Sequence, residues 1–163
     1  MIVFDASTLI LLAKVELLRR VVEAVEVMIP PVVESESTRK DTLDAGLIRT
    51  LIMEGKVKVK RVKEPGLVKR LMEDFRLDEG EAEALDMARG ELAILATDDG
   101  PTIKGCKVLG VEFATALHFL IRARERGVVD TEIALAKLEK LKAYGRYEPR
   151  IIEDARHRLM GGE

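Results

Sequence analysis

The chain alternates short apolar runs with longer amphipathic segments from its first residues almost to its end. Apolar runs bounded by Pro, Gly or charged residues predict buried strands, whereas apolar residues spaced three and four apart predict helices. The predicted strands are residues 2–4, 26–30, 56–62, 92–97 and 106–111. The predicted helices are residues 7–14, 16–25, 32–41, 45–55, 65–75, 79–90, 114–127, 131–145 and 149–159.

Strands that alternate with helices in this way favour a parallel sheet covered by helices on both faces. We therefore expect an α/β fold, a three-layer α/β/α arrangement with a central parallel sheet of four to five strands and C-terminal helices. Residues 56–62, KVKVKRV, have alternating polarity and one basic face, which is typical of a strand at the edge of a sheet. No repeat or linker divides the sequence, so residues 1–163 are interpreted as one domain, with a core over 1–127 and a helical extension over 128–163.

The composition excludes several classes of protein but does not by itself indicate a function. With 163 residues, 47% of them hydrophobic, the chain is long enough for one substantial core. A single cysteine, Cys106, excludes a disulfide framework or a cysteine zinc site within one chain and agrees with a cytoplasmic location. No run is long and apolar enough for a membrane span, so no membrane partner is expected. The net charge of −2 gives no general support to nucleic-acid binding, which has to rest on local basic patches.

Acidic residues gather where the predicted strands end. Asp5 follows the first strand, and Asp98 and Asp99 follow the fourth. In a parallel sheet, binding sites form at these carboxyl ends. Three glutamates in the neighbouring helices are placed to reach the same edge: Glu36, Glu81 and Glu83. Crowded carboxylates raise one another's pKa, and a divalent cation relieves that conflict. Oxygen ligands without His or Cys suit Mg²⁺ or Mn²⁺.

The sequence is equally compatible with a purely structural role for several of these acids. Asp5 or Ser7 is a favoured type of residue for the N-cap of the first helix, and Glu36 is compatible with a solvated helix face. Glu81 stands where it would complete a capping box with Asp78. The segment TDDG, residues 97–100, has the composition of a turn.

Three motifs in register resemble the PIN domain family of metal-dependent ribonucleases, which includes the VapC-type toxins. They are IVFDASTLILLAKVELL at residues 2–18, IPPVVESES at 29–37 and LDEGEAEALDMARGELAILATDD at 77–99. Their order and spacing resemble the family over about residues 1–127, and the tail resembles the closing helices of archaeal members.

The resemblance implies specific roles for individual residues. The implied catalytic acids are Asp5, Glu36, Glu83 and Asp99, and the implied metal ligands are the same four together with Asp98. Ser7, Thr97 and Glu81 are implied as supporting residues. The implied reaction is hydrolysis of RNA phosphodiester bonds assisted by Mg²⁺ or Mn²⁺.

The resemblance and the charge pattern together imply the partners. RNA, single-stranded or structured, is the expected substrate, with backbone contacts from Lys58, Lys60, Arg122 and Arg146. The family also implies a homodimer and, for a toxin of a toxin–antitoxin pair, an antitoxin protein. Two alternatives are a non-catalytic RNA-binding module of the same fold and a haloacid-type phosphatase. The phosphatase class needs a second Asp two residues after the first, and Ser7 occupies that position.

Overall fold

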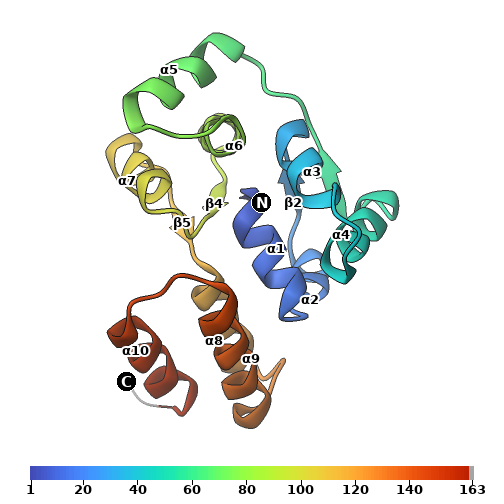
Figure 1. Ribbon diagram of the computed structural model, residues 1–163, viewed down its shortest axis with the longest axis vertical. Helices are drawn as coiled ribbons and strands as arrows, with labels where there is room; N and C mark the ends of the chain where they lie inside the picture. Colours follow the sequence, from blue (N-terminus) through green and yellow to red (C-terminus); the bar gives the residue numbers. More distant parts are fainter. Residues whose placement is uncertain (162–163) are drawn as a thin grey trace. The chain divides into compact units, whose positions relative to one another are not determined.

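The computed structural model describes residues 1–161 and divides into two compact units, Met1–Ala114 and the part from Thr115 onward. The first unit holds a five-stranded sheet in the order β3-β2-β1-β4-β5, and all neighbouring strands are parallel. Strands β2, β4 and β5 are labelled in Figure 1. The strands are β1 (Ile2–Phe4), β2 (Val27–Ile29), β3 (Val57–Val59), β4 (Ile94–Ala96) and β5 (Phe113–Ala114).

The inner strands are short and buried, which explains their continuous apolar sequences. Every residue of β1 and β2 is buried, and Val3 of β1 is paired with Met28 of β2 and Leu95 of β4. The predicted edge position of the basic strand is confirmed, because β3 is the last strand of the sheet and only its Val57 is buried.

Helices cover both faces of the sheet. The helices of the first unit are α1 (Ala6–Lys14), α2 (Leu18–Ala24), α3 (Pro31–Thr38), α4 (Leu43–Met53), α5 (Pro65–Phe75), α6 (Glu79–Gly90) and α7 (Gly100–Leu109). Helices α1 to α4 pack on one another, as do α5 to α7, and α6 lies against β1 and β4. Crossovers between parallel strands are right-handed as a rule, and by that rule the two groups lie on opposite faces, because the chain runs outward from β1 to β3 and then returns to β4. The predicted three-layer α/β/α fold with a parallel sheet is confirmed.

The prediction of a strand over residues 106–111 was wrong. Residues Gly100–Leu109 form α7, Gly110 ends it with a left-handed φ of 69°, and the fifth strand follows as Phe113–Ala114. The apolar positions of this short helix did not give a clear helical period. Gly105 allows α7 to approach α6, since a Cβ there would lie 3.0 Å from a side-chain carbon of Leu85.

The second unit is made of three helices, α8 (Ala116–Glu125), α9 (Thr131–Tyr144) and α10 (Pro149–Leu159), each of which packs on the other two. Its buried residues include Leu120, Leu138, Ile152 and Leu159. The sequence placed the start of the helical extension at residue 128, whereas here α8 groups with α9 and α10, so the second unit begins at Thr115. Over residues 1–161, no helix has the length and apolar character that crossing a membrane requires.

Candidate functional site

The order of the strands reverses between β1 and β4, because the chain builds the sheet first to one side of β1 and then to the other. A reversal of this kind leaves a crevice at the carboxyl ends of the two strands, where open α/β sheets bind their ligands. Asp5 directly follows β1, and Thr97, Asp98 and Asp99 follow β4. The backbone N–H of Asp5 donates to the carbonyl of Ala96 at 3.1 Å, which fixes the two strand ends to each other.

Asp5 lies at the bottom of this crevice with only 1% of its surface exposed. Its Oδ1 accepts hydrogen bonds from the Thr8 backbone N–H at 3.0 Å and from the Ser7 hydroxyl at 3.3 Å, and its Oδ2 accepts one from the Thr97 hydroxyl at 2.6 Å. Burial raises the pKa of Asp5 to about 6, although the bonds from Thr97 and Thr8 oppose that rise. Asp5 therefore caps α1, as one interpretation of the sequence proposed, and is also a buried carboxylate at the strand end.

A fully buried threonine hydroxyl holds each of the three aspartates. Besides the bond from Thr97 to Asp5, the Thr8 hydroxyl donates to Asp98 at 2.7 Å. The Thr102 hydroxyl donates to Asp99 at 2.7 Å, and the Thr102 backbone N–H donates to the same oxygen at 3.0 Å. Sequence reasoning identified Thr97 but missed Thr8 and Thr102. The signal was present, because both follow an N-cap aspartate by three residues.

Glu36 approaches the site from α3 and lies against the first turn of α6. A Cβ built at Gly80 would lie 3.1 and 3.2 Å from the two carboxylate oxygens of Glu36. Burial raises the pKa of Glu36, as do the negative charges of Asp78 and Glu79, while the positive charge of Arg39 lowers it.

Glu81 forms the predicted capping box at the start of α6. Its Oε2 accepts from the Asp78 backbone N–H at 2.9 Å, and its own N–H donates to the Asp78 carboxylate at 2.8 Å. Burial raises the pKa of Glu81 to about 7, with further upward contributions from the charges of Asp78, Asp99 and Asp5. Glu81 is therefore electrostatically part of the acidic site as well as a helix cap.

Glu83 lies on a different side of α6 from Glu81, because residues two apart do not share one face of a helix. It is 9% exposed and packs against the start of α3, where the backbone N–H of Val32 donates to its carboxylate. Within residues 1–161 its Oε2 has no hydrogen-bond partner. Burial, followed by the charge of Glu79 and then that of Glu36, raises its pKa.

One cavity of about 300 Å³ is lined by acids and by three cations, Lys14, Arg39 and Lys40. Its acids are Asp5, Glu36, Asp44, Asp78 and Glu81. Glu83 and Asp99 are not among its lining residues, although the charge of Asp99 is felt at Glu81. The structure thus brings Asp5 and Glu36 of the expected quartet together on the cavity and places Glu81, in preference to Glu83, beside them.

The sequence analysis did not anticipate the cations of this cavity. A helical signal existed for Lys14, because Ser7, Ile10 and Lys14 are three and four residues apart and share one face of α1. Arg39 and Lys40 follow the end of α3, and their position beside the acids depends on how α3 packs. Acids on the walls and cations among them suit a ligand that carries both a cation and negative charge.

The chemistry of the donors fits a hard divalent cation, because the converging groups are carboxylates and hydroxyls without His or Cys. Burial raises the pKa of Asp5 and of Glu81, and the charges of neighbouring carboxylates add to the rise, so the ionised forms are disfavoured there. Among residues 1–161, however, no group of three or more Asp, Glu, His or Cys side chains is close enough together to hold a metal ion as it stands. Assembly of such a site therefore requires some of these side chains to move closer together.

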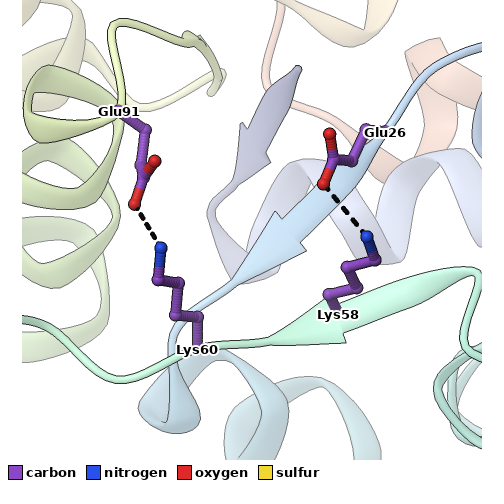
Figure 2. A network of polar contacts seen from close by, with 4 residues as sticks. All are labelled: Glu26, Lys58, Lys60 and Glu91. Atoms are coloured by element: carbon purple, nitrogen blue, oxygen red, sulfur yellow. Dashed lines mark hydrogen bonds and ion pairs between the residues drawn. The ribbon is translucent and has the colours of Figure 1, made fainter.

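The cations expected to contact RNA lie outside this cavity. Lys58 on β3 pairs with Glu26 at 3.1 Å and Lys60 pairs with Glu91 at 2.6 Å, as Figure 2 shows. Lys60 also lines a separate cavity of about 240 Å³ beside the end of α6. Arg122 and Arg146 are exposed residues of the second unit.

A three-layer α/β/α fold with carboxylates and cations at the switch point of its parallel sheet defines a class of α/β proteins with an acidic, phosphate-compatible site. Comparison with known families then identifies the member of that class: a family model described as PIN domain matches residues 1–160, and the chain belongs to this family. PIN domains are generally nucleases. No curated protein and no solved structure matched the chain.

Proposed function

We propose that this protein is a metal-dependent ribonuclease that hydrolyses RNA phosphodiester bonds. The observation that carries the proposal is the cavity at the switch point, where Asp5, Glu36 and Glu81 lie with Lys14, Arg39 and Lys40. Family membership supports nuclease chemistry, and the oxygen donors support Mg²⁺ or Mn²⁺.

The residues that would hold the cation are Asp5, Glu36, Glu81 and Asp99, with Asp98 beside them. We choose Glu81 over Glu83 because Glu81 lines the cavity and senses the charges of Asp5 and Asp99, whereas Glu83 packs against α3. A bound Mg²⁺ or Mn²⁺ supplies Lewis acidity, which activates water and neutralises charge that develops on the phosphate.

The protein's own residues orient the acids and the substrate. Ser7, Thr8 and Thr97 fix the rotamer of Asp5, so that a ligand carboxylate does not have to be ordered during the reaction. Lys14, Arg39 and Lys40 are placed to neutralise backbone phosphates beside the acids. Lys58, Lys60, Arg122 and Arg146 are proposed as additional backbone contacts. The ion pairs of Lys58 with Glu26 and of Lys60 with Glu91 do not oppose this role strongly, because ion pairs at the surface are weak.

The proposed biological setting rests on the family resemblance alone. It consists of a cytoplasmic homodimer that acts as the toxin of a toxin–antitoxin pair, with an antitoxin protein as its partner. The alternative function is a non-catalytic RNA-binding module. One observation favours it, since Glu81 and Asp99 are engaged in helix caps and no preassembled metal group exists within residues 1–161.

Cleavage of single-stranded RNA in Mn²⁺ and in EDTA tests the proposal. The parent should cut RNA only with the metal, and Asp5→Asn should lose at least about a hundredfold in rate, because a charged ligand is removed while the shape is kept. Asp130→Asn is the matched control, since Asp130 is also an N-cap aspartate but does not line the cavity. RNA binding without metal-dependent cleavage would instead support the non-catalytic module.

A further inference from the structure

We propose that Gly80 is a positioning residue whose missing side chain provides the space in which the Glu36 carboxylate lies. The inference rests on the proposed function, because it treats Glu36 as a ligand of the cation. Gly80 itself is buried and is the second residue of α6, at the point where α3 and α6 pack together.

The contact is tight at both carboxylate oxygens. A Cβ at position 80 would lie 3.1 Å from Oε1, 3.2 Å from Oε2 and 3.4 Å from Cδ of Glu36. The first two distances are shorter than nine in ten real contacts of a Cβ atom, so a methyl group would move the carboxylate by a few tenths of an ångström. Cation ligands need that accuracy, since their oxygen distances are confined to a narrow range.

The backbone does not explain the glycine. The φ of Gly80 lies outside the left-handed region, so an L residue fits the local conformation. Glycine within a helix also costs roughly 0.5–1 kcal/mol relative to alanine. The structural benefit of glycine at this position is therefore the space that Glu36 occupies.

The Glu36 carboxylate is the far end of a flexible side chain, so it can move when a methyl group is added at position 80. A methyl group at position 80 would let the carboxylate turn away from α6 at little cost to the fold. We therefore expect metal affinity and stability to respond in opposite directions.

The experiment compares Gly80→Ala with Gly66→Ala. Gly66 is the second residue of α5, and nothing lies within 4 Å of a Cβ built there. In EDTA both variants should melt at or above the temperature of the parent, because alanine is the better helix residue. Mn²⁺ titration calorimetry without RNA should show a loss of about tenfold in affinity for Gly80→Ala, the size typical of residues that orient a ligand. Gly66→Ala should bind as the parent does.

A double-mutant cycle then tests whether Gly80 acts through Glu36. In the Glu36→Gln background, adding Gly80→Ala should cause no further loss of Mn²⁺ affinity. An equal loss in both backgrounds, or parental affinity in Gly80→Ala, would overturn this inference while leaving the nuclease proposal intact. A parent that binds no Mn²⁺ would overturn both. If Gly80→Ala melts far below the parent, recovery in Gly80→Ala/Glu36→Ala supports the contact and failure to recover overturns it.

Discussion

At the scale of single residues, the site is dominated by acids that the fold keeps in an unfavourable state. Asp5 is buried, and even three hydrogen bonds do not offset the loss of solvation, so its pKa is raised to about 6. Glu81 is raised to about 7 by burial and by its acidic neighbours. Ionised carboxylates at these places raise the free energy of the folded protein without metal. A bound cation relieves that cost, and the relief favours cation binding.

The pH dependence of stability should reveal Asp5. Its folded pKa of about 6 lies above its ordinary value of 3.8, so stability from this group is full below about pH 4 and is lost as pH rises through 6. The separation of about two pH units corresponds to roughly 3 kcal/mol. In EDTA, Asp5→Asn should therefore gain up to about 3 kcal/mol on the parent between pH 4 and pH 7. Urea unfolding of both proteins at the two pH values measures this, and parallel profiles would contradict it.

At the scale of elements, the same acids begin the helices that surround the site. Asp5 caps α1, Asp78 and Glu81 form the capping box of α6, and Asp99 caps α7. Helix N-termini favour negative charge, so these positions stabilise carboxylates that would otherwise repel one another. The structural and the functional interpretations of these residues are thus not exclusive, because one carboxylate has enough lone pairs for a cap and a cation.

Two substitutions at Asp99 should separate these roles. Asp99→Ala removes the acceptor for the N–H and the hydroxyl of Thr102 and should lower the free energy of unfolding in EDTA by about 1 kcal/mol. Asp99→Asn keeps a good cap and should be close to the parent in EDTA. Both should lose most of the rise in melting temperature that millimolar Mn²⁺ gives the parent, because both remove the charge. A full Mn²⁺ response in Asp99→Asn would show that Asp99 is only a cap.

At the scale of the whole molecule, the net charge does not reveal how the charged side chains are distributed. The net charge is −2, yet Lys14, Arg39 and Lys40 are gathered on one cavity. Binding to a nucleic-acid backbone depends on such local sets, and each phosphate contact contributes to the salt dependence of affinity. The position of the cations relative to the acids, more than their number, decides whether an RNA backbone reaches the reactive groups.

The salt dependence of RNA binding should identify the cavity cations. Lys40→Gln should reduce the slope of log affinity against log salt for single-stranded RNA by about 0.7, the value for one contact. Lys69→Gln, an exposed residue of α5 that does not line the cavity, should leave the slope unchanged. Fluorescence anisotropy in EDTA measures binding without cleavage. Equal slopes for parent and Lys40→Gln would remove Lys40 from the proposed RNA contact surface.

The sequence by itself determined the α/β class, the edge position of β3 and the capping box of Asp78 and Glu81, because each depends on local periodicity or on neighbours within four residues. It also placed Asp5, Asp98 and Asp99 at strand ends, which is a local property. Only the tertiary structure decided which glutamates join them. Glu81 and Glu83 are two residues apart and face different directions, and the packing of α6 against α3 selects one for the cavity and buries the other. Two other contacts likewise join residues that are far apart in the sequence. The Thr8 hydroxyl donates to Asp98, and Gly80 leaves the space that Glu36 occupies. Sequence periodicity reports only on neighbours along the chain, so it could predict neither contact.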